Sequence, residues 1–114
     1  MKKIAMKKNV FLNSIDFSPG IVEYEDFPVQ KGIPLSEQID ILKEDLLQVM
    51  FYGTKRLVID LGWYPSFEKK GKFQIRVVEE SNWEKFSFYA ETDNLEKLHT
   101  LLYQAVRYCQ KQQA

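Results

Sequence analysis

Three runs of alternating apolar and polar residues, joined by short connections, constrain the fold of this chain most strongly. They cover residues 57–64, 72–79 and 85–91. A period of two is typical of β-strands that turn one face toward a core. The connections, residues 65–71 and 79–82, are too short to hold a crossover helix. We therefore expect three strands that pair antiparallel in sequence order.

The alternation divides the strand side chains between two faces of this sheet. The apolar face is predicted to carry Leu57, Ile59, Leu61, Trp63, Phe73, Ile75, Val77, Phe86, Phe88 and Ala90. The opposite face is mixed and carries Asp60, Tyr64, Arg76 and Tyr89. The apolar face needs a covering layer, whereas the mixed face has no role that the pattern explains.

Two helices, 35–51 and 94–110, are predicted to cover the apolar face. The first follows from helical spacing of Leu35, Ile39, Leu42, Leu46 and Val49. The second follows from the same spacing of Leu95, Leu98, Leu102, Val106 and Cys109, with Asp93 as its N-cap. The expected fold is therefore α+β, an antiparallel sheet of three or more strands with two helices on one face.

The first 33 residues have a weaker pattern. Val10–Phe17 and Ile21–Tyr24 look extended and flank a Ser18-Pro19-Gly20 turn, which suggests an added N-terminal hairpin or edge strands.

Length and composition indicate one ordinary globular domain spanning residues 1–114. The chain is 45% hydrophobic and 28% charged, and its single cysteine, Cys109, rules out an internal disulfide. The N-terminal apolar run, Ile4–Met6, is far shorter than the core of a signal peptide, and no stretch approaches the roughly 20 apolar residues that span a bilayer. We therefore expect a cytoplasmic protein with no membrane partner.

The residue inventory predicts no catalytic site, cofactor or metal. His99 and Cys109 lie ten residues apart on one predicted helix. This spacing separates them by about 15 Å and prevents a thiolate–imidazole pair. Zinc ligand sets and a glycine-rich phosphate loop are also absent from the sequence. We therefore expect that this protein is not an enzyme, with His99 on the helix surface or at the boundary of the core and Cys109 in the core.

The formal charge of zero conceals an acidic block. Residues 16–45 carry eight acids and two lysines, a net charge of −6. A neutral total disfavours a dedicated nucleic-acid binder, while a local acidic block attracts a basic partner. The polar side of the first predicted helix offers the partner-binding candidates Glu37, Asp40, Glu44 and Asp45, which are otherwise a solvated helix face.

Two further features are candidates for binding. The segment Gly62–Phe67 concentrates aromatic residues at a strand end, where Tyr64 and Phe67 would serve as apolar anchors for a partner. Lys69, Lys70, Lys72 and Arg76 line the following hairpin. They form either a solvated loop or, with the sheet aromatics, the contact surface of a small RNA-binding module.

The second half of the chain resembles small bacterial immunity proteins of contact-dependent growth inhibition and related polymorphic-toxin systems. The likeness is carried by Ile59-Asp60-Leu61-Gly62-Trp63-Tyr64-Pro65-Ser66-Phe67, Gly71-Lys72-Phe73, Asn82-Trp83-Glu84 and the helix opening Thr92–Leu98. The resemblance implies a protein that binds the C-terminal toxic domain of a cognate effector, often a nuclease, and blocks it. It assigns no partner-contacting residues, because the toxin-facing surface varies within such families.

Overall fold

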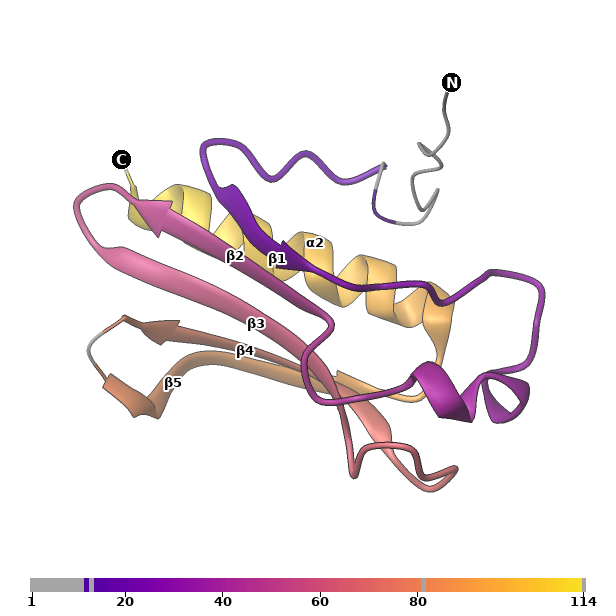
Figure 1. Ribbon diagram of the computed structural model, residues 1–114. Helices are drawn as coiled ribbons and strands as arrows, with labels where there is room; N and C mark the ends of the chain where they lie inside the picture. Colours follow the sequence, from indigo (N-terminus) through magenta and orange to yellow (C-terminus); the bar gives the residue numbers. More distant parts are fainter. Residues whose placement is uncertain (1–11, 13, 81, 114) are drawn as a thin grey trace.

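The computed structural model describes residues 12, 14–80 and 82–113 and shows a five-stranded antiparallel sheet with a C-terminal helix against one face (Figure 1). The elements are β1 (Ile21–Glu25), η2 (Leu35–Glu37), η3 (Ile39–Ile41), β2 (Leu47–Tyr52), β3 (Arg56–Tyr64), β4 (Lys72–Glu79), β5 (Asn82–Thr92) and α2 (Leu95–Gln112). The strands lie in sequence order, β1-β2-β3-β4-β5. The α+β class and the antiparallel pairing are therefore confirmed. Within the described residues, no helix is both long and apolar enough to cross a membrane.

The predicted helix over residues 35–51 is wrong. Its first part forms the short 3-10 helices η2 and η3, and its last part is the strand β2. Leu47, Val49 and Phe51 alternate as buried residues along β2, which pairs with β3 from Leu47↔Leu61 to Tyr52↔Arg56. Strand pairing and burial on a sheet outweigh the helical spacing, which here was coincidental.

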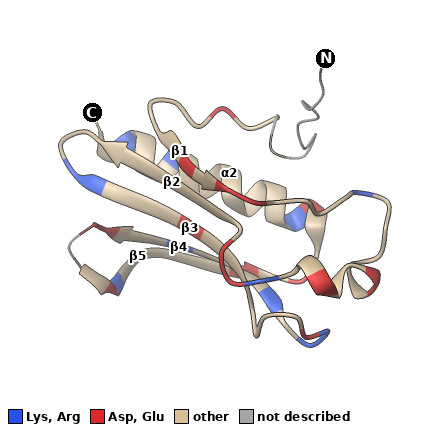
Figure 2. Cartoon of the chain, in the orientation of Figure 1, with Lys and Arg blue, Asp and Glu red and all other residues tan. Residues whose placement is uncertain are grey.

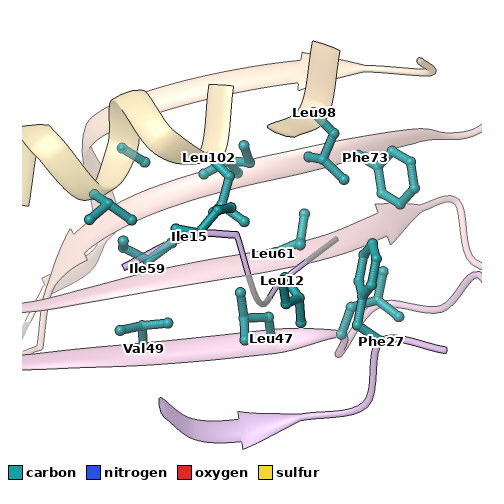
Figure 3. Packing of buried hydrophobic residues seen from close by; sticks show 14 of the residues in the cluster. Leu12, Ile15, Phe27, Leu47, Val49, Ile59, Leu61, Phe73, Leu98 and Leu102 are labelled. Carbon is teal, nitrogen blue, oxygen red and sulfur yellow. The ribbon is translucent and has the colours of Figure 1, made fainter. Parts of the chain in front are cut away.

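The N-terminal part of the chain fills the place expected for that helix. Leu12, Ile15 and Phe27, labelled in Figure 3, belong to the buried cluster that also contains the apolar residues of α2, and so does Val29. Hydrogen bonds attach this layer to the helix, from Gln110 Nε2 to the Ser18 carbonyl at 2.8 Å and between Ser14 Oγ and His99 Nε2 at 2.6 Å. The apolar face is thus covered by one helix and an irregular segment instead of two helices.

The N-terminal hairpin prediction is correct only for its edge strand. β1 contains the predicted Ile21–Tyr24, but it pairs with β2. The turn before it is present, with the Gly20 N–H donating to the Phe17 carbonyl at 2.7 Å. Of the other extended segment, residues 14–17 form no strand, and residues 10, 11 and 13 lie outside the described part.

Helix α2 agrees with its prediction except at its N-cap. Asn94, not Asp93, is the cap, because its side-chain oxygen accepts the Lys97 N–H at 2.8 Å. The buried face of α2 comprises Leu98, Leu102, Ala105, Val106 and Cys109.

A bulge in β5 overturns the face predicted for Phe86. Val77 pairs with Phe88 and Val78 with Phe86, so Ser87 is an extra residue on β5. The inserted residue rotates Phe86 onto the face opposite α2, where its side chain is 45% exposed. Phe88 stays on the apolar face and is half-buried.

The thiol of Cys109 should resist modification in the folded protein. Burial raises the pKa of Cys109 to about 12, so the reactive thiolate is scarce at pH 8. We expect labelling by a disulfide reagent to be on the order of 10³-fold slower than in urea-unfolded chain. Absorbance of the released chromophore measures both rates, and rapid stoichiometric labelling of the native protein would contradict this burial.

Candidate functional site

The candidate site begins on the face of the sheet opposite α2, which we call the open face. Strand register places one residue from each strand in a single row across it. This row consists of Tyr24, Gln48, Asp60, Arg76 and Tyr89. Of the four residues predicted for the mixed face, Asp60, Arg76 and Tyr89 are therefore neighbours across adjacent strands, whereas Tyr64 pairs with Lys72.

An ion pair lies at the centre of this row. Asp60 is 4% exposed, and its Oδ2 accepts a hydrogen bond from Arg76 Nη2 at 3.1 Å. Gln48 Nε2 donates to Asp60 Oδ1 at 3.2 Å. Burial raises the pKa of Asp60, and the Gln48 and Arg76 contacts offset only part of that rise. The pair is a structural cross-link between β3 and β4 on the open face.

Aromatic rings surround the Arg76 guanidinium. Its central carbon lies 4.8 Å from the Tyr64 ring centroid and 5.8 Å from that of Phe86. Phe86 stacks on Tyr89 with centroids 5.6 Å apart, and both side chains are 45% exposed. Arg76 Nη2 also donates to the Tyr64 hydroxyl. Arg76 is therefore held by its neighbours and is not a free surface cation.

The connection from η3 into β2 bends over the end of β3. The Trp63 N–H donates to the Lys43 carbonyl at 2.8 Å, and the Leu46 N–H donates to the Leu61 carbonyl at 3.0 Å. Two residues, Glu44 and Asp45, therefore stand opposite the single residue Gly62. This two-against-one arrangement has the form of a β-bulge.

Gly62 makes this bulge possible. A Cβ atom at Gly62 would lie 2.0 Å from the Glu44 carbonyl oxygen, so any larger residue would push the connection away. The Tyr64 hydroxyl donates to the same carbonyl at 3.4 Å. The Tyr64 hydroxyl also accepts a hydrogen bond from Arg76. Tyr64 therefore links the open-face cluster, which consists of Asp60, Arg76, Phe86 and Tyr89, to the connection that carries Glu44.

The structure brings four of the six predicted partner-binding residues to one end of the sheet. Glu44 and Asp45 lie beside Tyr64, and Phe67 is tied to the same connection by its N–H, which donates to the Leu42 carbonyl at 2.7 Å. Phe67 has a φ of 64° and a side chain that is 53% exposed. The result is a small surface made of two exposed acids, the exposed Phe67 and the half-buried Tyr64.

Glu37 and Asp40 occupy a different setting from the helix face predicted for them. They lie on η2 and η3, are exposed, and precede the Glu44–Asp45 bulge along the chain. Figure 2 shows acidic residues on these turns, on the connection and along β1. We call this surface the acidic edge; it comprises Glu23, Glu25, Asp26, Glu37, Asp40, Glu44 and Asp45.

The acidic edge has little compensation by cations. Lys43, which directly precedes Glu44 in the sequence, pairs with Asp26. Among residues 12, 14–80 and 82–113, none of Glu37, Asp40, Glu44 and Asp45 forms an ion pair. Within the described part of the chain, these four carboxylates are exposed and have no cationic partner of their own.

The predicted basic cluster is divided. Arg76 pairs with Asp60, whereas Lys69 and Lys70 are exposed on the loop between β3 and β4, with Lys70 3.5 Å from Glu68. Lys72 stands four residues before Arg76 along β4, a separation of about 13 Å. The cluster therefore does not form one continuous cationic surface with Arg76.

Sequence reasoning missed three residues of the site. Phe86 was assigned to the core because alternation alone does not reveal a bulge. The acids of β1, Glu23 and Glu25, belonged to the acidic block but were not selected, because the edge strand that aligns them was itself weakly defined.

His99 and Cys109 do not come together. His99 is half-buried at the start of α2 against Ser14, and Cys109 is in the core, as expected for both. The part of the chain that the structure describes contains no group of three or more His, Cys, Asp or Glu residues able to hold a metal ion. Comparison with models of protein families, with curated proteins and with solved structures gives no match.

Proposed function

We propose that this protein is an immunity protein, which binds a cognate toxin domain and neutralises it by protein–protein contact. One observation carries the proposal: Glu44 and Asp45, which are exposed and form no ion pair with any described residue, lie beside Tyr64 and the exposed Phe67 at the end of β3. Protein interfaces commonly combine aromatic residues at their centre with a polar rim. The sequence resemblance to immunity proteins supports the same function.

The chemistry of this surface favours a basic partner. A toxin that cleaves nucleic acid must approach a polyanion, so its substrate surface is positively charged. Carboxylates along the acidic edge would speed encounter with such a surface, and the aromatic side chains would slow dissociation. Binding there would also cover the toxin's substrate site.

The test uses the C-terminal domain of a large secreted protein encoded beside this gene. This domain is expressed from an inducible promoter with and without the present chain, and growth is measured, with calorimetry for the purified pair. We expect the chain to restore growth and to form a complex whose association slows as salt increases. A neighbourhood without such a domain, or a toxicity that the chain leaves unchanged, would refute the proposal.

Charge reversal locates the contact surface. Glu44→Lys combined with Asp45→Lys should weaken the complex at least tenfold, about 1.4 kcal/mol, because both acids are exposed and neither forms an ion pair with a described residue. Glu79→Lys combined with Glu84→Lys is the matched control, since these exposed acids lie on β4 and β5. Equal loss in both variants would show a general charge effect and no specific surface.

The alternative is a small RNA-binding module, and one observation favours it. Phe86 and Tyr89 form an exposed stacked pair on a sheet face, an arrangement on which bases can stack. We then expect single-stranded RNA to bind at about 50 mM salt and to dissociate by about 200 mM, with Phe86→Ala weakening binding. Fluorescence anisotropy of labelled RNA measures this binding, and the absence of binding at low salt would refute the RNA-binding alternative.

A further inference from the structure

The edge strand β1 presents backbone groups that another strand can use. All five of its residues are exposed, and it hydrogen-bonds to β2 on one side only. No strand in the described residues lies against its outer side. Alternate N–H and C=O groups of an antiparallel edge point outward, which makes such an edge a template for strand addition.

The charges on β1 are acidic. Edge strands commonly carry charged residues, most often lysine, or proline, and Ile21–Glu25 contains two glutamates but neither lysine nor proline. A bulge between Val22 and Tyr24 is the one irregularity in its pairing with β2. By contrast, the opposite edge, β5, carries Lys85 and has two register shifts against β4.

Charge determines which strand this edge accepts. Glu23 and Glu25 lie within the strand and Asp26 follows it, so pairing with a second copy of β1 would bring like charges together. A strand with lysine or arginine at these places would instead be attracted. Ile21, Val22 and Tyr24, which are 54%, 43% and 41% exposed, offer apolar contacts between the acids.

This edge is continuous with the rest of the acidic edge. The Asp26 N–H donates to the Leu46 carbonyl at 2.9 Å, which places the end of β1 beside the connection that carries Glu44 and Asp45. A basic segment that pairs with β1 and continues past its end would therefore reach Glu44 and Asp45, the acids that we propose to contact the toxin.

We propose that β1 is a docking edge for an extended basic segment of a protein partner, which adds to the sheet as a sixth strand. The inference deepens the proposed function by naming how the partner is held, and rests on it only for the identity of that partner. Backbone pairing supplies affinity, and the acid–base pairs at Glu23 and Glu25 supply selectivity.

The test uses the full chain labelled with ¹⁵N and three synthetic hexapeptides. The first alternates lysine and valine, the second replaces each lysine with glutamate, and the third interrupts the basic peptide with a central proline. At millimolar concentration, the basic peptide should slow amide exchange within Ile21–Glu25 by at least about tenfold. The glutamate and proline peptides should leave these amides unchanged.

Variants separate strand addition from simple attraction of charge. Glu23→Lys combined with Glu25→Lys should lose the response to the basic peptide and gain one to the glutamate peptide. Glu79→Lys combined with Glu84→Lys, far from β1 in the sheet order, should respond like the parent. Protection by the proline peptide, protection at β5, or no protection at all would overturn the proposal.

The outcome is distinguishable from failure of the proposed function. If the basic peptide protects the amides of β1 but the chain neutralises no toxin, the docking edge is supported and the immunity function is refuted. A toxin domain held through Glu44 and Asp45 without slower exchange in β1 would reject the docking edge and leave the immunity function intact.

Discussion

Replacement of Trp63 by alanine is expected to lower the free energy of unfolding by about 3–5 kcal/mol. The side chain is 1% exposed and packs edge-on against Phe73, with ring centroids 5.0 Å apart. Its Nε1 donates to the Glu68 carbonyl at 2.9 Å, which ties the loop between β3 and β4 to the core. The alanine variant therefore leaves a cavity and removes one of the two hydrogen bonds that the Glu68 carbonyl accepts, since the Gly71 N–H also donates to it at 3.0 Å.

Urea denaturation followed by circular dichroism measures this loss. Trp63→Phe should be less destabilising, because it retains most of the apolar volume and removes only the hydrogen bond. Trp83→Ala is the matched control, since Trp83 is 47% exposed and should change stability by no more than about 0.5 kcal/mol. Equal losses from Trp63→Ala and Trp83→Ala would contradict the packing described.

Truncation of Arg76 to alanine should destabilise the protein by about 3 kcal/mol at pH 7. The change removes the cation that pairs with Asp60, whose side chain is 6% exposed. The Asp60 carboxylate would then be buried without its counter-ion, held only by Gln48. Loss of the cation also raises the pKa of Asp60 further, beyond the increase that burial already causes.

The pH dependence of this loss has a defined sign. A carboxyl whose pKa is raised by folding binds its proton more tightly in the folded protein than in the unfolded chain. The contribution of Asp60 to stability is therefore most favourable below the unfolded pKa of 3.8, and it decreases as pH rises through the folded pKa. Arg76→Ala should therefore be less destabilising in mild acid than at pH 7.

A second substitution isolates the buried charge as the cause. Adding Asp60→Asn to Arg76→Ala should recover much of the stability at pH 7, because no charge then remains buried. Urea denaturation of the parent, the two single variants and the double variant, at pH 7 and in mild acid, gives the double-mutant cycle that separates the two effects. A loss that is independent of pH, or one that the asparagine does not relieve, would show that Arg76 acts through packing alone.

The open-face cluster was only partly accessible from sequence. Alternation placed Asp60 and Arg76 on the same face, yet their ion pair depends on the register that sets Asp60 opposite Arg76. Phe86 reached this face through a bulge, which no periodic pattern reveals. Glu44 and Asp45 were selected for their charge, although they lie on a bulge over Gly62 and not on a helix.

By itself, the sequence determined the elements whose signals are local. The alternation in β3, β4 and β5, the short connections between them and the helical spacing in α2 each lie within a continuous stretch. Such a pattern needs no distant partner to indicate a strand or a helix, although the face on which Phe86 of β5 lies depended on the bulge against β4.

Only the tertiary structure decided the fate of residues 35–51 and the layer beside α2. Helical spacing and strand alternation overlap in that stretch, and pairing of Leu47–Tyr52 with β3 selected the strand. The part of the apolar face that the predicted first helix would have covered is covered instead by Leu12, Ile15, Phe27 and Val29. Hydrogen bonds and buried contacts between residues far apart in the chain settle such competitions, because their free energies exceed the small differences in local preference.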